Sequence, residues 1–294
     1  MVTSIIAWGD SILKGVVSGG DSKRFDITEK DSLSQACAAL GIELANKSVF
    51  GSWMTKTRRT QDRSLRNGAS VQIGIIESGT NDSDYDWSAV SANPDAEHLQ
   101  RCPLDEFERL MEEAVSVARQ NKITPVIMIP TPLVPEWWLN NICIGNDEAA
   151  IVKFIARKYG LNENCLVNQE CGGQKALQDQ NCAAKKNCSQ DQKAAADGDC
   201  LQDQNCAAAN EKCVQDLKRA AAMRLYQNQE LFSLKAAAIA RALGVQIVDI
   251  RSEFLAHPNY KTLMCLDGVH PNQAGYDFMA EIWKREMPRL GLEF

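Results

Sequence analysis

The sequence predicts a three-layer α/β/α sandwich built on a doubly wound, flavodoxin-like sheet of five parallel strands. Three observations support this fold class: apolar runs of strand length recur along the chain, helical patterns separate them, and each run ends in a loop of glycine or polar residues. Strands that alternate with helices of this length need crossover connections, which produce a parallel sheet covered on both faces. Ligands of such sheets bind beyond the carboxyl ends of the strands. We therefore expect the functional residues in the loops that follow the strands.

The individual elements follow from the period of the apolar residues. The run at residues 2–7 is β-branched and stops at Gly9-Asp10-Ser11, so we expect a buried strand that ends in a tight loop. Four further strands are expected at residues 43–49, 71–76, 125–129 and 245–250. Helices are expected at residues 31–40, 53–66, 103–120, 148–159, 217–243 and 272–287.

One segment, residues 161–216, breaks this alternation. It is rich in Ala, Gln, Asn, Asp, Lys and Cys, it holds seven of the eleven cysteines, and the sequence of residues 177–184 recurs at 201–208. We interpret it as a Cys-rich insertion, helical or disordered, that divides a catalytic domain into residues 1–160 and 217–294. A role as a lid or as the binding site of a protein partner is the sharper alternative. Its cysteine spacing is wider than zinc sites usually show, and a reducing cytoplasm argues against disulfides.

The composition argues against two classes of partner. The net charge is -6 with acidic and basic residues interspersed, so no basic stripe is available to a nucleic-acid backbone. The apolar runs are far shorter than the roughly 20 residues that a membrane span needs. No signal peptide is visible, so we expect a cytoplasmic protein, or a secreted one if a leader segment precedes this sequence.

Acyl transfer from an ester needs a nucleophile, a base, a group that orients the base, and donors for the developing oxyanion. Ser11 follows the first strand, where its hydroxyl could attack and its N–H could bind the oxyanion. Alternatively, Asp10 and Ser11 only cap a helix. His270 is the favoured base among three histidines, because His98 lies in a polar stretch and His257 directly precedes a proline.

Two further residue types complete this chemistry. Asp267 precedes His270 by three residues, so one turn can place its carboxylate on the imidazole, where it would fix the tautomer. A helix-capping loop with an incidental histidine is the alternative. Asn81 follows the third strand and could donate its side-chain amide to the oxyanion, although Gly, Asn and Asp are also ordinary turn residues. Gly51 follows the second strand, and a lone glycine there usually serves only the turn.

Taken in order, these strand ends resemble the SGNH (GDSL-type) hydrolase family. The resemblance covers residues 2 to about 160 and 217 to 290, and it departs at Ile12, where the GDSL name has leucine. It rests on Gly9-Asp10-Ser11, Gly51, Gly79-Thr80-Asn81-Asp82 and Asp267-Gly268-Val269-His270. The family resemblance implies Ser11 as nucleophile, Asp267 and His270 as the rest of the triad, and an oxyanion hole of the Ser11 and Gly51 N–H groups with the Asn81 side chain.

We therefore expect a serine esterase that acts on carboxylic esters through an acyl-serine intermediate, with no cofactor and no metal at the active site. The sequence contains no Gly-x-Ser-x-Gly elbow, and no nucleotide-binding loop follows the first strand. A lysophospholipase or acyl-thioesterase with the same triad is the rival enzyme. Outside enzymes, the rival is an interaction protein with a partner-binding Cys-rich arm.

Aromatic residues near the expected rim favour a short acyl ester, such as an acetyl ester, of a small-molecule or oligosaccharide carbohydrate. Flat aromatic faces on loops suit sugar rings. Each ring could instead pack its loop onto the core. The candidates for substrate binding are Trp53, Tyr85, Trp87 and Trp137.

Overall fold

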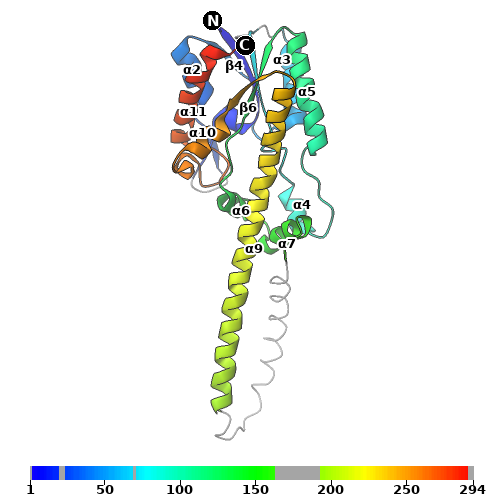
Figure 1. Ribbon diagram of the computed structural model, residues 1–294, viewed down its shortest axis with the longest axis vertical. Coiled ribbons are helices and arrows are strands. Elements are labelled where there is room, and N and C mark those ends of the chain that lie inside the picture. Colours follow the sequence, from blue (N-terminus) through cyan, green and yellow to red (C-terminus); the bar gives the residue numbers. More distant parts are fainter. Residues whose placement is uncertain (1, 20–23, 69–70, 163–192, 291–294) are drawn as a thin grey trace. The chain divides into compact units, whose positions relative to one another are not determined.

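The computed structural model describes residues 2–19, 24–68, 71–162 and 193–290, and of residues 193–209 it describes the backbone alone (Figure 1). The chain forms two compact units. The first unit comprises Met1–Asp86, Glu97–Ile144 and Leu225–Phe294, and the second comprises Trp87–Ala96 and Gly145–Arg224.

The first unit is built on a five-stranded sheet in which all neighbouring strands run parallel. The strand order is β4-β1-β5-β6-β7, so the predicted flavodoxin-like sheet is confirmed. The order reverses beside β1, and a ligand crevice is therefore expected at the carboxyl ends of β1 and β5. The strands are β1 (Ser4–Trp8), β4 (Glu43–Asn46), β5 (Ile73–Glu77), β6 (Thr124–Ile129) and β7 (Gln246–Asp249).

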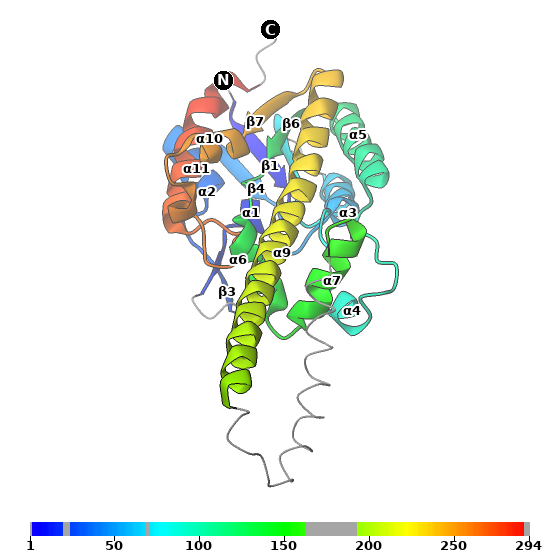
Figure 2. The ribbon, with the colours of Figure 1, turned by 60° about the horizontal axis from the view of Figure 1, so that its bottom comes forward.

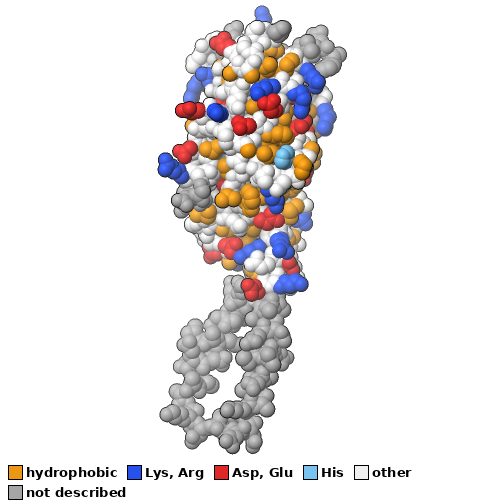
Figure 3. Space-filling view, turned by 90° about the vertical axis from the view of Figure 1, so that its left-hand side faces the viewer, with side chains coloured by type: hydrophobic (Ala, Val, Ile, Leu, Met, Phe, Trp, Pro, Cys, Tyr) orange, Lys and Arg blue, Asp and Glu red, His pale blue; other side chains and the backbone are white. Residues whose placement is uncertain are grey.

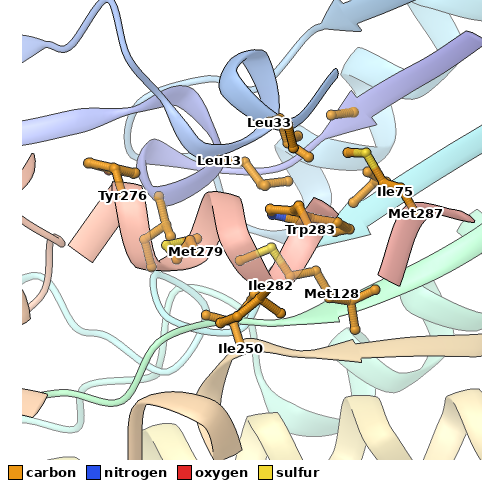
Figure 4. Close-up of a cluster of buried hydrophobic side chains, with 14 of the residues drawn as sticks. Leu13, Leu33, Ile75, Met128, Ile250, Tyr276, Met279, Ile282, Trp283 and Met287 are labelled. Atoms are coloured by element: carbon orange, nitrogen blue, oxygen red, sulfur yellow. The ribbon is translucent and has the colours of Figure 1, made fainter. Parts of the chain in front are cut away.

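One face of the sheet is covered by α2, α10 and α11, on the left in Figure 1. Ile5 and Ala7 of β1 enter this core because side chains of a strand point alternately to its two faces. Figure 4 shows how side chains of the sheet and of α11 meet around the fully buried Trp283. These helices are α2 (Ser32–Leu40), α10 (Ile250–Ala256) and α11 (Gln273–Glu286).

The opposite face is covered by α3, α5 and residues 225–242 of α9, and this arrangement makes the sheet the middle of three layers. Ile6 and Trp8, the alternate residues of β1, enter this second core. Phe107 of α5 meets Phe232 of α9 edge to face, with ring centroids 5.1 Å apart. These helices are α3 (Met54–Arg66), α5 (Leu104–Gln120) and α9 (Lys193–Ala242).

The structure adds short elements that the period of the apolar residues does not predict. The strands β2 (Val16–Ser18) and β3 (Phe25–Ile27) form a separate antiparallel pair, and three residues are too few to show a readable alternation. Figure 2 brings forward the end of the sheet near which α1, α6 and β3 lie. The other short elements of this unit are α1 (Ser11–Lys14), α6 (Pro135–Cys143), η2 (Tyr260–Leu263) and η3 (Met287–Arg289).

The second unit contains α4 (Trp87–Ala92), α7 (Glu148–Lys158) and the first part of α9. The rings of Trp87 and Phe154 meet edge to face at 6.4 Å, and Asp95 forms ion pairs with Lys153 and Arg157.

The long helix α9 begins at Lys193, whereas the sequence predicts a helix only from residue 217. Alanine and glutamine favour helix without providing an apolar stripe, so a search for apolar period misses this part. Residues 163–192 of the expected insertion lie outside the described residues. Cys213 is disulfide-bonded, which the sequence analysis did not expect of a chain in a reducing compartment.

Two findings concern charge and hydropathy. On the face that Figure 3 shows, acidic and basic side chains are intermixed rather than gathered by sign. Among the described residues, no helix combines the length and the apolar character needed to cross a membrane.

Candidate active site

The loop after β1 positions Ser11. Asp10 is the N-cap of α1, and its Oδ1 accepts a hydrogen bond from the N–H of Ile12 at 2.8 Å. A Cβ on Gly9 would lie 2.5 Å from Oε2 of Glu77 and 2.8 Å from Cδ1 of Leu13, so a larger residue there would require these buried side chains to move. Ser11 therefore begins a helix, as the capping alternative expected, and its side chain is also directed to a histidine.

A continuous chain of hydrogen bonds joins Ser11, His270 and Asp267. Oγ of Ser11 lies 2.8 Å from Nε2 of His270, and Nδ1 of His270 lies 2.7 Å from Oδ2 of Asp267. The other oxygen of Asp267 accepts the N–H groups of Val269 and His270 at 2.9 and 3.0 Å. The structure thus brings together the three residues that the sequence analysis singled out, from opposite ends of the chain.

The charge of Asp267 follows from its surroundings. Burial acts to raise its pKa, but the hydrogen bonds from the His270 ring and from two backbone N–H groups outweigh burial and lower the pKa. An ionised carboxylate accepts the Nδ1 proton of a neutral imidazole, which leaves Nε2 as an acceptor for the Ser11 hydroxyl. This is the arrangement that a general base requires.

The turn that carries these groups is packed tightly against the start of α6. Gly268 has φ +77, and a Cβ there would lie 2.5 Å from the backbone nitrogen of Trp138. Its carbonyl oxygen accepts the N–H of Val134 at 2.8 Å. Asp267 and His270 are therefore held by backbone contacts as well as by each other.

A cavity of about 210 Å³ opens at Ser11, and Asn81 and Gly51 contribute to its lining. Nδ2 of Asn81 donates to Oδ2 of Asp10 at 2.8 Å, and the second hydrogen of the amide stays available to a ligand. Gly51 has φ +63, a left-handed conformation that favours glycine. The lining residues are Ser11, Phe25, Phe50, Gly51, Thr80, Asn81, Ser83, Asp84, Arg101, Leu133, Trp138, Asn141, Leu225, Asp267, Val269 and His270.

Three buried carboxyl groups lie beside these loops. Burial raises the pKa of Asp10, raises that of Asp82 to about 6 and, with the nearby charge of Asp10, raises that of Glu77 well above its usual range. Glu77 accepts the backbone N–H of Asp10 at 2.8 Å. Among the described residues, no group of three or more His, Cys, Asp and Glu side chains could hold a metal ion.

The four aromatic residues proposed for substrate binding do not line the cavity. Tyr85 is completely buried, so it cannot offer a face to a ligand, and Trp87 is 7% exposed and belongs to the second unit. Trp53 packs against the core beside α3, where the Lys56 ammonium lies 3.6 Å from its ring centroid, and Trp137 packs against the core that contains α11. The alternative, that these rings pack loops onto the core, describes Trp53, Tyr85 and Trp137.

Three other aromatic residues line the cavity instead. The Phe25 and Phe50 rings lie 5.1 Å apart, and the His270 ring lies 5.4 Å from Phe25 and 6.3 Å from Phe50. Trp138 adds a third ring from α6. Phe50 immediately precedes Gly51 and could have been suspected from that position, whereas Phe25 comes from the unpredicted strand β3.

Comparison with known proteins gives one match to a protein family and several to solved structures. Residues 5–283 match the family described as GDSL-like Lipase/Acylhydrolase. No match was found among curated proteins.

The similar structures share the fold at low sequence identity. A lipase/acylhydrolase from Enterococcus faecalis is 13% identical, with 99% of both chains covered and a TM-score of 0.56. A GDSL-like lipase from Bacteroides thetaiotaomicron is 13% identical, with 98% of this chain and 88% of that chain covered and a TM-score of 0.51. An acetylxylan esterase from Geobacillus stearothermophilus is 15% identical, with 99% and 95% covered and a TM-score of 0.51.

Proposed function

Because this chain belongs to the GDSL-like lipase/acylhydrolase family and is a carboxylic ester hydrolase, we propose that it removes short acyl groups, acetyl above all, from carbohydrates through an acyl-Ser11 intermediate. The family that the sequence motifs resemble is thereby confirmed. The observation that carries the proposal is the hydrogen-bonded chain from Ser11 through His270 to Asp267, which opens on a cavity also lined by Asn81.

The reaction proceeds in two steps. Oγ of Ser11 attacks the ester carbonyl carbon while Nε2 of His270 takes the hydroxyl proton, and the same proton then passes to the departing alcohol oxygen. Water next attacks the acyl-Ser11 carbonyl, with His270 again as base, and releases the acid and the free serine. Asp267 keeps the imidazole in one tautomer and stabilises the imidazolium that forms in each step.

The oxyanion of each tetrahedral intermediate is bound by the N–H of Ser11, the N–H of Gly51 and the amide of Asn81. Support comes from the position of Ser11 at a helix start and from the lining positions of the other two residues. Donors of this kind act best when they are fixed before the reaction, and the bond from Asn81 to Asp10 fixes one of them.

The size of the cavity favours a small acyl group over a long one. Cavities for drug-sized ligands hold about 300–1,000 Å³. The cavity beside Ser11 holds about 210 Å³, which is enough for an acetyl group and part of a sugar ring. Long-chain lysophospholipids and acyl-thioesters need more enclosed apolar volume. The fold shared with an acetylxylan esterase agrees with this choice.

The lining of the cavity also suits a sugar. Trp138 offers an aromatic ring, and Asn141, Asp84 and Arg101 offer donors and acceptors for hydroxyl groups. The side chains of Arg101 and Asp84 lie 3.7 Å apart, so each orients the other. Two other proposals do not depend on the active site: residues 161–216 bind a protein partner, and the protein is cytoplasmic.

The proposal is tested by measuring acetate release from acetylated xylo-oligosaccharides and hydrolysis of 4-nitrophenyl acetate and palmitate. We expect turnover of both acetyl substrates, little turnover of palmitate, and a loss of about three orders of magnitude or more in kcat for Ser11→Ala. Ser11→Ala with the activity of the parent would refute the mechanism. Faster turnover of palmitate than of acetate would replace the carbohydrate substrate with a lipid one.

A further inference from the structure

Asp82 makes hydrogen bonds to two loops that carry proposed oxyanion donors. Its side chain is completely buried. Oδ1 accepts the N–H of Met54 at 2.7 Å, and Oδ2 accepts the N–H of Gly79 at 2.8 Å. Met54 follows Gly51 by three residues, and Gly79 opens the loop that contains Asn81. One carboxylate therefore connects the two loops.

The N-terminus of α3 depends on this carboxylate. Trp53 is the N-cap of α3 and makes no side-chain capping bond, so the first N–H groups of the helix need an acceptor from elsewhere. Asp82 supplies this acceptor, because its Oδ1 accepts the N–H of Met54, the first residue of the helix. The loop after β5 thus holds the start of α3 through Asp82, and it also restrains the residues between Met54 and Gly51.

The third proposed donor, the N–H of Ser11, is connected to Asn81 through the carboxylate of Asp10. Oδ1 of Asp10 accepts the N–H of Ile12, next to Ser11, and Oδ2 accepts the side chain of Asn81, each at 2.8 Å. Two buried carboxylates thus connect three loops. Asp10 links the loop of Ser11 to the loop of Asn81, and Asp82 links the loop of Asn81 to the one that contains Gly51.

We infer that Asp82 is a positioning residue, which sets the separation of the Gly51 and Asn81 donors so that both reach one oxyanion. The inference rests on the proposed function, because it presupposes that these two groups bind the oxyanion. Asp82 is not among the residues that line the cavity, so it acts only through the loops. Removing one oxyanion donor costs about 10²–10³ in kcat, and displacing one is expected to cost about tenfold or more.

The variant Asp82→Asn tests this role. Asparagine keeps one acceptor oxygen but turns an NH2 group toward the N–H of Met54 or Gly79, which pushes the two loops apart. A chain of hydroxyl contacts, Ser52 to Thr57 at 3.0 Å and Thr57 to Ser78 at 3.4 Å, still links them and favours a folded variant.

The measurement is the burst of 4-nitrophenol from 4-nitrophenyl acetate, together with steady-state kcat and KM. The burst amplitude counts competent sites, and the burst rate reports stabilisation of the acylation transition state. We expect an amplitude close to that of the parent, a burst rate and kcat lower by about tenfold or more, and a KM changed by less than about threefold. Asp105→Asn, the same change at an exposed position of α5, should leave all three unchanged.

A merely structural role for Asp82 predicts a different pattern. In that case, Asp82→Asn lowers the melting temperature or the burst amplitude but keeps the burst rate per competent site, and this result would overturn the inference. If Asp82→Asn does not accumulate as folded protein, Asp82→Glu, which keeps the charge but displaces it by one methylene, is measured in the same way with the same expected loss in rate. Activity retained by Ser11→Ala would instead refute the proposed function, so the two failures are distinct.

Discussion

Asp267 and Asp82 are both buried carboxylates that accept two backbone N–H groups, yet their pKa values shift in opposite directions. Burial acts to raise both values. At Asp267, the hydrogen bond and charge of His270, with two backbone N–H groups, reverse the effect and lower the pKa. At Asp82, the backbone hydrogen bonds are insufficient, the charge of Asp10 adds to burial, and the pKa rises to about 6. Burial alone therefore does not determine how a carboxylate in this site titrates.

The difference matches two different roles around the active site. Asp267 contacts the imidazole that moves the proton, so its charge is used directly in the reaction. Asp82 accepts hydrogen bonds from the backbone N–H groups of Met54 and Gly79 and from the side chain of Ser78, so it acts by holding the loops. Substitutions at Asp267 are expected to alter proton transfer. Substitutions at Asp82 are expected to alter the positions of the oxyanion donors.

The largest expected effect is that of Asp267→Asn on kcat. An asparagine can present its NH2 to Nδ1 of His270, which favours the tautomer with a proton on Nε2 and removes the acceptor for the Ser11 hydroxyl. We expect kcat for 4-nitrophenyl acetate to fall by about three to four orders of magnitude. A fall of less than tenfold would show that the carboxylate has no orienting role and would end the contrast with Asp82.

The opposite pKa shifts predict opposite contributions to stability as pH changes. Asp82 keeps its proton in the folded protein up to about pH 6, whereas the unfolded chain loses it near 3.8, so stability falls as pH rises between these values. Between pH 5 and pH 8, the free energy of unfolding of the parent should fall by about 1 kcal/mol relative to Asp82→Asn. Denaturant unfolding at both pH values measures this difference.

Asp267→Asn is the matched control for that experiment. A lowered pKa contributes stability above the ordinary value near 3.8, and this stability is lost only as pH falls below that value. Because the Asp267 carboxylate does not itself titrate between pH 5 and pH 8, its own ionisation should contribute no change in unfolding free energy over this range. A drift equal to that of Asp82→Asn would mean that the two carboxylates titrate alike.

The sequence predicts the parts of this site that depend on strand ends. Ser11 and Asn81 each follow a buried apolar strand, and Gly51 follows the edge strand β4. Parallel strands bring their carboxyl ends to one edge of the sheet, so the convergence of these three residues follows from topology. His270 lies further along the chain, after β7, α10 and η2. The connection that Asp82 makes between the loops of Gly51 and Asn81 is not predictable in this way. It depends on the backbone N–H groups of Met54 and Gly79, and only the folded loops define the directions of these groups.

The aromatic residues that line the cavity differ from those expected from the sequence, because the sequence does not define the direction of each side chain. Trp137 and Trp138 are neighbours in the sequence, but successive residues of a helix point about 100° apart, so one packs on the core and the other lines the cavity. The sequence shows that a pair of tryptophans lies in this region, but it does not show which of the two lines the cavity. Phe25 lies on a three-residue strand, which gives too short a pattern to place any side chain.

This tryptophan pair provides a smaller test, on substrate binding rather than on chemistry. Trp138 packs beside the loop of Asp267, since a Cβ on Gly268 would meet its backbone nitrogen. Trp138→Ala should raise KM for acetylated xylo-oligosaccharides by about tenfold, or about 1.4 kcal/mol, with little change in kcat. KM for 4-nitrophenyl acetate, which has no sugar, should stay near that of the parent, and Trp137→Ala is the control. This pattern is the reverse of that expected for Asp82→Asn. An equal rise of KM for both esters would remove Trp138 from sugar binding.

Reduction of the disulfide at Cys213 should have the smallest effect on activity. Cys213 belongs to the second unit, whereas every residue that lines the cavity, and both carboxylates, belong to the first. The hydrogen-bonded chain from Ser11 to Asp267 and the bonds that Asp82 makes to the two donor loops all involve residues of the first unit. After treatment with a reductant, kcat and KM for 4-nitrophenyl acetate should therefore change by less than about twofold. Alkylation followed by mass spectrometry verifies that Cys213 reacts only after reduction. A loss of activity above tenfold would show that the geometry at Ser11 depends on the second unit, and the contrast between Asp267 and Asp82 would then have to include a contribution from that unit.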